Sequence, residues 1–513
     1  MTSNLLKRVR FLVFLGVSAC LCISATQAEI RYVSPSGSNT TGDGSIDNPW
    51  QTINYGLQNI AAGDTLTIRG GTYAEKIGIG AIPSGTSEDA RTVLQNYSGE
   101  KVIIQPPTGT GPGVVFLGRE KYVTIRGDAP YNVVLDADNI GGAALYLGTG
   151  NAISDSATYI RIENVEIKNA VSSGVLRGHL NEFISAWVHH NGSDSGDHGI
   201  YVGGSDSLIE NCVINNNAAF GIHNYHGPGN QGGVMASRNI YRNNRCYDNA
   251  RSGIIISHGV NNQVYNNLCY GNGHYGILVQ YGRATDTEVY NNTAYDNRLG
   301  GIVVGSSAGE GTIVRNNIAY GNGGDQFSAA VEVTEDHNLF GVDPLFVSTD
   351  PANPDFMKIS ADSPAKDAGT SVGSIATLVT SDFWYDERPQ GAGLQGLKMR
   401  ANPPNDDHPH GMWYDIGADE YAEIDAPASL TATVLSPTQV DLAWTNVDRE
   451  TRYRLERRTG DGAFEPLAVT TANRTSYSDT AVAAGTTYSY RVRAERPQGS
   501  SAWTVSNVVT TSF

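Results

Sequence analysis

An asparagine-centred motif recurs at nearly regular intervals in the middle of the chain, and this repeat constrains the fold more than any other feature. The motif reads NNRCYDN at Asn243, NNLCYGN at Asn266, NNTAYDN at Asn291 and NNIAYGN at Asn316, in steps of 23, 25 and 25 residues. A Gly-Ile pair repeats beside it in steps of 22, 32, 23 and 25 residues, at Gly199-Ile200, Gly221-Ile222, Gly253-Ile254, Gly276-Ile277 and Gly301-Ile302. A period of this length, with several short strands in each repeat, indicates a solenoid.

The composition decides between the classes of solenoid. Leucine-rich repeats have a similar period, but they need a leucine framework that is missing here. The chain has 59 Gly together with many Asn and β-branched residues, which is typical of short strands joined by tight turns. We therefore predict an all-β fold, a parallel β-helix with coils of about 22–25 residues. Equivalent residues of successive coils then stack about 4.8 Å apart.

Stacking turns the repeat into columns, and most of the columns have a purely structural interpretation. The Ile of each Gly-Ile pair forms an inward aliphatic column. The second Asn of each motif forms a candidate ladder of side-chain amides at a turn: Asn244, Asn267, Asn292 and Asn317.

Two further columns contain residue types that can also carry chemistry. Cys246 and Cys269 lie one coil apart and are continued by alanines, which indicates buried small residues rather than catalytic thiols. A neighbouring column consists of Tyr247, Tyr270, Tyr295 and Tyr320. We interpret the tyrosines as a stacked aromatic ridge, with a sugar-binding platform as the alternative.

The two ends of the repeat region resemble a known group of proteins. The stretch RYVSPSGSNTTGDGSIDNPWQTI, followed by GDTLTIRGGTYAE, resembles the N-terminal cap and first coil of the secreted right-handed parallel β-helix proteins of bacteria. The segments NLFGVDPLF, SPAKDAGT and YDIGADEY resemble the ending of many of them, although an insert around His408 and His410 departs from the usual short form. The group includes polysaccharide lyases, uronate epimerases and some glycoside hydrolases. The likeness covers Glu29–Tyr421 and implies a fold rather than one reaction, because this fold hosts several chemistries.

A different pattern begins at about Ala426. Alternating strands such as QVDLAWTN and TTYSYRVRAE suit one β-sandwich. They resemble a fibronectin type III domain, with Trp444 in the core and Tyr488 at the tyrosine corner, which implies a spacer rather than a sugar-binding module. We expect a signal peptide at 1–28, the β-helix with its cap at 29–337, the tail of the helix at 338–421 and this domain at 426–513.

The first 28 residues predict export. Lys7, Arg8 and Arg10 precede the apolar stretch Phe11–Ile23, and small residues follow it, as in a secretory signal. The predicted location is extracellular or periplasmic, with lipid anchoring at Cys20 as the alternative. No later stretch is apolar enough to cross a membrane.

Charge and cysteine content exclude some functions. Removal of the signal takes away three basic and no acidic residues, so the formal charge changes from −17 to −20. Such a surface repels nucleic acid, and it also disfavours a polyanionic substrate unless a local Arg, Lys or metal site reverses the field. Three cysteines remain, an odd number, so at least one thiol is free or paired between chains. The chain has no zinc-binding spacing.

The outward positions of the coils are where a β-helix acts, because its interior is filled. Counting from the Gly of each Gly-Ile pair, alternation places +1 and +3 inward and +2 and +4 outward. The +2 column is Tyr201, His223, Ile255, Leu278 and Val303. Polar groups therefore gather over the first coils of this series. A Gly-rich excursion, 226–237, lengthens one coil beside them and is a candidate cleft wall.

This cluster suits β-elimination on a uronic-acid polymer, which requires the carboxylate to be neutralised, the C5 proton removed and the leaving oxygen protonated. We assign neutralisation of the substrate carboxylate to Arg251 or a bound cation. His223, with an unperturbed pKa near 6.5, is the predicted base. Tyr201 or Tyr225 is the predicted acid, and either of them can share the role of the base. Further candidate substrate-binding residues are Asp197, His198, His226, His258, His274 and Gln280. For His198 an inward orientation stays open.

Three alternatives stay open on the sequence. A uronate C5-epimerase would use the same groups and return the proton to the opposite face. A glycoside hydrolase needs two carboxylates, for which Asp194, Asp197 and Glu210 are weakly placed candidates. A glycan-binding or adhesion protein would use the same face without chemistry. The predicted partner is a polysaccharide bound by a monomer. The sequence identifies no cofactor. It has no EF-hand-like loop that would indicate a Ca²⁺ site, so whether the protein binds Ca²⁺ stays open.

Overall fold

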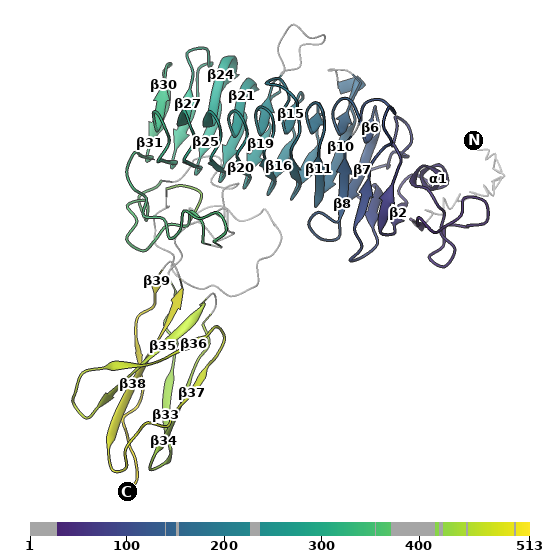
Figure 1. The fold of residues 1–513 in the computed structure, drawn as a ribbon. Helices are drawn as coiled ribbons and strands as arrows, with labels where there is room; N and C mark the ends of the chain where they lie inside the picture. The colour runs from purple at the N-terminus through teal and green to yellow at the C-terminus, as the bar shows by residue number, and fades with distance from the viewer. Residues whose placement is uncertain are drawn as a thin grey trace, which may run out of the picture.

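The computed structural model places the chain in an all-β fold, a right-handed parallel β-helix followed by a separate antiparallel region (Figure 1). The predicted fold class is confirmed in both respects. The residues that the structure describes are 28–138, 140–149, 153–225, 236–353, 355–370, 416–419, 424–447, 450–496 and 499–513.

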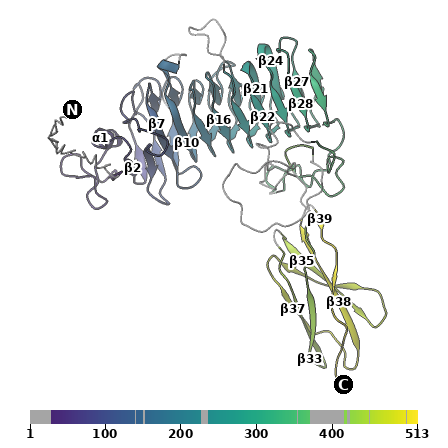
Figure 2. The same ribbon diagram turned by 180° about the vertical axis from the view of Figure 1, so that it is seen from behind.

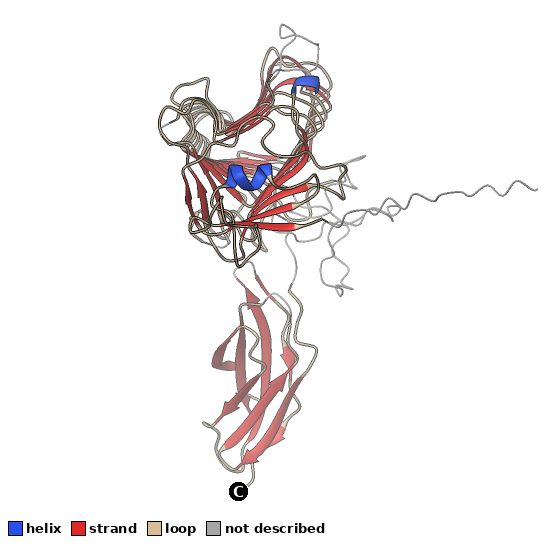
Figure 3. Cartoon of the chain, turned by 90° about the vertical axis from the view of Figure 1, so that its right-hand side faces the viewer, coloured by secondary structure: helices blue, strands red, loops and turns tan. Residues whose placement is uncertain are grey.

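Each full coil of the helix contributes one strand to each of three parallel sheets, which the views from behind and along the axis also show (Figures 2 and 3). Sheet A contains β1 (Ile30–Val33), β2 (Thr65–Ile68), β4 (Thr92–Asn96), β7 (Lys121–Arg126), β10 (Thr158–Glu163), β13 (Glu182–Ile184), β16 (Leu208–Glu210), β19 (Ile240–Arg242), β22 (Gln263–Tyr265), β25 (Glu288–Tyr290), β28 (Ile313–Arg315) and β31 (Thr334–Asp336).

Sheet B contains β3 (Gly71–Tyr73), β5 (Val102–Ile104), β8 (Val133–Asp136), β11 (Val165–Lys168), β14 (Trp187–His189), β17 (Val213–Asn215), β20 (Arg245–Tyr247), β23 (Leu268–Tyr270), β26 (Thr293–Tyr295), β29 (Ile318–Tyr320) and β32 (Leu339–Phe340). Sheet C contains β6 (Val115–Leu117), β9 (Leu145–Leu147), β12 (Val175–Leu176), β15 (Ile200–Val202), β18 (Ile222–Asn224), β21 (Ile254–Val260), β24 (Tyr275–Thr285), β27 (Gly300–Val304) and β30 (Phe327–Ala329). A short helix, α1 (Ile53–Gln58), lies near the N-terminal end, and a 3-10 turn, η1 (Ile153–Asp155), precedes β10.

The register of sheet C confirms the predicted isoleucine column. The Ile of each Gly-Ile pair is the direct partner of the Ile in the next coil, from Ile200 to Ile302. All of them are buried in one continuous core. The preceding glycine is required because the coils approach closely there. A Cβ atom on Gly253 would lie 2.9 Å from the Gly276 carbonyl oxygen and 3.0 Å from the Asn272 amide nitrogen.

The predicted asparagine ladder is confirmed by its hydrogen bonds. The backbone N–H and the side-chain amide of Asn244 both donate to Oδ1 of Asn267, each at 3.0 Å. The same pair of bonds repeats from coil to coil as far as Asn338. A second ladder, which we did not predict, is formed by the last Asn of each motif and its equivalents in two earlier coils: Asn191, Asn217, Asn249, Asn272, Asn297 and Asn322.

The cysteine and tyrosine columns follow their structural interpretations. Cys246 and Cys269 are direct partners in sheet B, and all three described cysteines are buried and free. Tyr247 and Tyr270 stack with ring centroids 4.9 Å apart. Tyr270 is only 6% exposed, because Phe356 of the tail packs edge-on against its ring. A column covered in this way is a packing ridge, so the structure does not support the sugar-platform alternative.

The antiparallel region has two sheets around its own core. One sheet contains β33 (Leu430–Ser436), β34 (Gln439–Trp444) and β37 (Ser476–Asp479); the other contains β35 (Arg452–Thr459), β36 (Glu465–Thr471), β38 (Thr487–Arg496), β39 (Gly499–Ser500), β40 (Thr504–Val505) and β41 (Val509–Thr510). Trp444 is buried in this core, and the Tyr488 hydroxyl accepts a 2.8 Å hydrogen bond from the Ala483 N–H.

Candidate functional site

The outer face of sheet C brings the predicted catalytic residues together. Tyr201 and His223 are direct partners in β15 and β18, and Ile255 follows in β21. Within β15, Ile200 and Val202 are buried in the core while Tyr201 between them is half-buried on the outside. The predicted +2 column is therefore present, and its ionisable members, Tyr201 and His223, lie on adjacent coils as predicted.

Six side chains form a connected group here, which we call the histidine–tyrosine cluster: His198, Tyr201, His223, Tyr225, Ser257 and His258. His223 contacts both tyrosines, with ring centroids 5.4 Å from Tyr201 and 5.1 Å from Tyr225. The Tyr225 ring in turn lies edge-on to His258 at 4.6 Å. Residues of successive coils thus contribute to a single patch of outer surface.

A chain of hydrogen bonds runs through the middle of the cluster. Nδ1 of His223 lies 2.9 Å from Nε2 of His198, and Nε2 of His223 lies 3.0 Å from the Ser257 hydroxyl. Because a neutral imidazole has one donor and one acceptor nitrogen, the two tautomers are linked. If His198 donates to His223, then His223 donates to Ser257; if His223 donates to His198, then Ser257 donates to His223.

Burial makes both imidazoles weak bases. His223 is 9% exposed and His198 is 3% exposed. Burial lowers the pKa of His198 to about 4; the Asp197 carboxylate opposes this shift and the Arg251 charge adds to it. Burial also lowers the pKa of His223 well below its usual range, and the neighbouring histidines and Arg251 act in the same direction. The histidine pair is therefore neutral at pH 7.

Two sequence-based expectations about these histidines need correction. The sequence assigns His223 an unperturbed pKa, but His198 and Phe220 pack against its ring and burial disfavours the charged form. An inward orientation is open for His198 on the sequence, but its ring stacks on Tyr201 on the outer face at 5.6 Å. Its Nδ1 atom is buried and has no hydrogen-bond partner among the described residues.

The tyrosines form the more accessible part of the cluster. Tyr201 and Tyr225 are both half-buried, and their ring centroids lie 6.1 Å apart. Burial and the neighbouring Tyr225 raise the pKa of Tyr201, while the charge of Arg177 lowers it by less. The Tyr201 hydroxyl is therefore protonated near neutral pH and is able to donate a proton or a hydrogen bond.

Arg251 supplies a positive charge beside the cluster. Its guanidinium lies over the Phe220 ring at 5.6 Å, and its charge lowers the pKa values of His198, His223 and His274. The side chain is half-buried, and no carboxylate forms an ion pair with it among the described residues. A half-buried cation without a carboxylate partner is suited to an anionic ligand.

The other predicted binding residues are distributed more widely. Asp197 accepts hydrogen bonds from the backbone of Ser193 and Asp194, so its carboxylate stabilises the turn before β15. His274 is half-buried, and burial, followed by the charges of Arg251 and Arg298, lowers its pKa. Gln280 lies further along on β24, with its side chain against Gly305. His226, His408 and His410 lie outside the described residues.

Sequence reasoning missed three residues around the cluster. Ser257 occupies the +4 column one coil after Tyr225, so its place beside the cluster could have been inferred from the repeat. Phe220 directly precedes a Gly-Ile pair, a position that gives no sign of an outward ring. Arg177 follows Gly174-Val175, which lies 25 residues before Gly199 and extends the glycine phase by one coil. The Val in place of Ile concealed this extension, and Arg177 lies at +3, where alternation predicts an inward side chain; its φ of 75° breaks that alternation.

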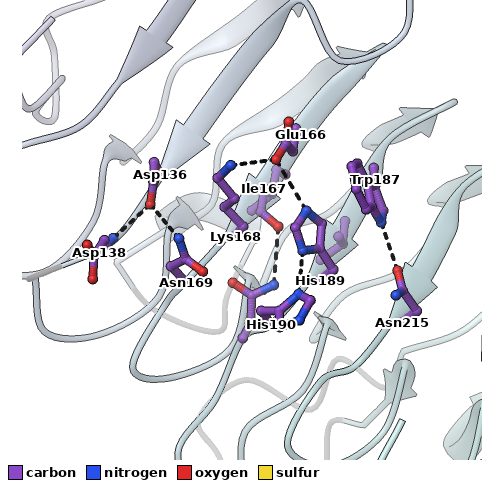
Figure 4. A network of polar contacts seen from close by, with 12 residues as sticks. Asp136, Asp138, Glu166, Ile167, Lys168, Asn169, Trp187, His189, His190 and Asn215 are labelled. Atoms are coloured by element: carbon purple, nitrogen blue, oxygen red, sulfur yellow. Dashed lines mark hydrogen bonds and ion pairs between the residues drawn. The ribbon is translucent and has the colours of Figure 1, made fainter. Parts of the chain in front are cut away.

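A second polar network lies on the outer face of sheet B (Figure 4). Its centre is Glu166, 5% exposed, which contacts Lys168 at 2.6 Å and both Lys101 and His189 at 3.3 Å. Burial raises the pKa of Glu166, but the hydrogen bonds from His189 and Lys168 and the lysine charges outweigh it, giving a pKa of about 2.

The histidines of this network lie at the end of a strand. His189 is the last residue of β14 and stacks on Trp187 at 3.9 Å. It belongs to the outward column of Lys168 and Asn215 in sheet B. Because both nearby lysines form ion pairs with Glu166, the cations of this network already have a carboxylate partner, unlike Arg251.

Comparisons with known proteins agree with the fold. A family model described as the right handed beta helix region matches residues 151–340. Pectate lyase PEL9 of Emericella nidulans is 43% identical over 88 residues, which cover 17% of this chain and 21% of that protein. The chain thus spans about a fifth of the length of this curated relative.

Solved structures show weaker likenesses. A complex of XylC with xylose is 13% identical, with a TM-score of 0.39 over 56% of this chain and 75% of that one. The A-module of the mannuronan C-5 epimerase AlgE4 of Azotobacter vinelandii is 17% identical, with a TM-score of 0.35 over 54% of this chain and 87% of that one. FN3tt is 20% identical, with a TM-score of 0.16 over 17% of this chain and 95% of that one.

Two kinds of feature are absent from the described residues. No three side chains of the His, Cys, Asp and Glu types are grouped in the described ranges as a metal site would require. Over the same part of the chain, no helix has the length and apolar character needed to cross a membrane.

Proposed function

We propose that the protein is a polysaccharide lyase that cleaves a uronic-acid-containing glycan by β-elimination at the histidine–tyrosine cluster. The observation that carries this proposal is the neutral, hydrogen-bonded pair His198–His223 beside the guanidinium of Arg251, which has no carboxylate partner among the described residues. The chain as a whole is acidic, so a local cation of this kind is the feature that admits an acidic sugar. The local similarity to a pectate lyase supports the same class of substrate.

The steps are assigned to groups that the cluster holds. Arg251 binds the uronate carboxylate, which makes the C5 proton more acidic. The proton passes to Nε2 of His223, in the tautomer in which Nε2 is the acceptor and loses the hydrogen bond that it accepts from the Ser257 hydroxyl; the resulting imidazolium donates from Nδ1 to Nε2 of His198. Tyr201 donates its hydroxyl proton to the leaving glycosidic oxygen as the C4–O bond breaks and the C4–C5 double bond forms.

Hydrolysis is less well supported by the described carboxylates. A hydrolase needs two carboxyl groups that flank the scissile bond. Asp197 and Asp194 both accept backbone hydrogen bonds within the turn before β15. Glu210 lies on β16 in sheet A and forms an ion pair with Arg242 at 3.0 Å. The three carboxylates are therefore engaged in a turn or an ion pair rather than placed as a facing pair beside His223.

The test is a panel of purified alginate, pectate, glycosaminoglycans and xylans. Elimination gives unsaturated ends that absorb in the ultraviolet, whereas hydrolysis gives reducing ends without that absorbance. Epimerisation gives solvent-hydrogen exchange at C5 without chain cleavage, and a binding protein only slows migration on a glycan gel. Any of the last three results, obtained without unsaturated ends, refutes the lyase proposal.

Variants then test the assignment of the site. His223→Gln and Tyr201→Phe should each lower the rate by about a hundredfold or more, the usual contribution of general acid–base groups. The matched control is His190→Gln, which alters a histidine of the sheet B network and should leave the rate unchanged. Full activity in both cluster variants would show that the reaction occurs elsewhere.

We further propose that residues 426–513 are a fibronectin type III domain that serves as a spacer, and that the chain is exported and monomeric. The buried Trp444 and the Tyr488 hydroxyl bonded to the backbone support the first assignment. Gel filtration of the mature chain and N-terminal sequencing of the secreted product test the other two.

A further inference from the structure

A second arginine lies on the opposite side of the cluster from Arg251. Arg177 directly follows β12, one coil before Tyr201, and its backbone N–H donates to the Tyr201 carbonyl at 3.0 Å. The side chain is half-buried, and its charge acts on the Tyr201 hydroxyl. Gly203, the nearest +4 residue, lies against both residues, since a Cβ atom there would be 3.6 Å from Cα of Arg177 and 3.8 Å from the Tyr201 ring.

Arg177 resembles Arg251 in having no carboxylate partner among the described residues. Several other half-buried arginines of the β-helix are paired with carboxylates, such as Arg161 with Glu182, Arg242 with Glu210, and Arg315 with Asp336, whereas Arg245 donates instead to the Tyr270 hydroxyl. These pairs show how the fold normally neutralises a guanidinium that has lost part of its hydration. Arg177 and Arg251 both flank the histidine–tyrosine cluster.

The coil spacing sets the distance between the two cations along the helix axis. Arg177 follows β12 and Arg251 precedes β21, and the strands β15 and β18 lie between them in the sheet. Three coil steps at about 4.8 Å place them about 14 Å apart along the axis. One monosaccharide cannot bridge that separation, whereas several consecutive sugars of a chain can.

We propose that Arg177 binds a second carboxylate of the substrate, so that Arg177 and Arg251 together select a chain of acidic sugars that crosses the coils between them. In the register of sheet C, Arg177 lies two residues after Val175 and Arg251 three residues before Ile254, so this path is oblique to the helix axis. This inference rests on the proposed function, because it uses the same site and the same class of substrate. It adds that at least two units of the polymer are recognised by their carboxylates, with the reacting unit between the two arginines.

The experiment measures affinity and cleavage for uronate oligomers from dimer to hexamer, with polymer retardation on an affinity gel. In the wild-type protein the affinity should rise with oligomer length. Arg177→Gln should remove most of that rise and weaken hexamer binding by about tenfold to a hundredfold, the effect of one charge-assisted hydrogen bond. Arg177→Lys keeps the charge but loses the planar guanidinium, so its affinity for the hexamer should lie between that of the wild type and that of Arg177→Gln.

Two controls separate this effect from misfolding and from general charge. Arg126→Gln removes an exposed guanidinium on β7 that bonds to Gln95, and it should not alter the length dependence. A carboxyl-reduced polymer should bind wild type and Arg177→Gln equally. The thermal midpoint of each variant shows whether the fold is intact.

The outcomes distinguish this inference from the proposed reaction. An unchanged length dependence in a folded Arg177→Gln variant overturns the inference even if the protein is a lyase. A wild-type protein that binds the polymer without forming unsaturated ends overturns the lyase reaction, and loss of retardation in Arg177→Gln would then still support the arginine pair. Failure of the wild type to bind any acidic polymer overturns both.

Discussion

Acidification should weaken the β-helix through the buried histidine pair. His198 has a pKa of about 4 in the folded chain, against a usual value of 6.5. Between these values the unfolded chain binds the proton and the folded chain does not, so stability rises with pH in this window. The contribution is complete above pH 6.5 and is lost as the pH falls towards 4. At about 1.4 kcal/mol per pKa unit, His198 alone accounts for about 3 kcal/mol.

The magnitude is measurable by urea unfolding at a series of pH values, followed by far-ultraviolet circular dichroism. His198→Phe keeps an aromatic ring against Tyr201 and Phe220 but cannot titrate. The free energy of unfolding of the wild type should fall by about 3 kcal/mol more than that of His198→Phe between pH 6.5 and 4. His337→Gln, which removes an exposed histidine after β31, is the matched control and should follow the wild type.

His223 should act in the same direction, because burial also lowers its pKa. A fall of equal size in wild type and His198→Phe would refute the reasoning. It would mean that the pair is accessible enough to be protonated in the folded chain, and the neutral base in the proposed reaction would lose its basis.

Three further perturbations test the architecture that carries the site. Gly253→Ala should destabilise the helix by about 1–3 kcal/mol, because the added methyl group meets the next coil, whereas Gly78→Ala, whose new methyl group would have no atom within 4 Å, should be nearly neutral in thermal unfolding. Asn267→Ala removes the acceptor for two Asn244 donors and leaves the Tyr241 carbonyl without this donor, so chemical denaturation should show a loss of about 3 kcal/mol or more. Phe356→Ala should cost about 3–5 kcal/mol and make the tail more sensitive to protease, because this ring covers Tyr270; unchanged proteolysis would contradict that packing.

Part of the fold and part of the site could be predicted because a solenoid converts sequence period into spatial proximity. Residues one period apart become direct neighbours in a parallel sheet, so Tyr201 and His223 could be placed side by side from their distance to a Gly-Ile pair. The same logic gave the asparagine ladder and the cysteine pair. It failed for Arg177 for two reasons. The coil that carries it has Gly-Val in place of Gly-Ile, and Arg177 lies at +3, which alternation places inward, whereas its φ of 75° takes it out of the strand alternation.

By itself, the sequence determined the β-helix, its inward columns and the coils on which ionisable groups gather. Only the tertiary structure decided how deeply those groups are buried and which of them have partners. The pKa of His223 depends first on burial, to which the Phe220 ring contributes, and then on the charges of His198, His258 and Arg251, whose distances to the ring no repeat specifies. Likewise, Arg177 and Arg251 cannot be told apart from paired arginines by spacing, because an ion pair depends on whether a carboxylate on a neighbouring coil reaches the guanidinium. Period fixes which residues are neighbours; burial and charge pairing depend on everything else that packs around them.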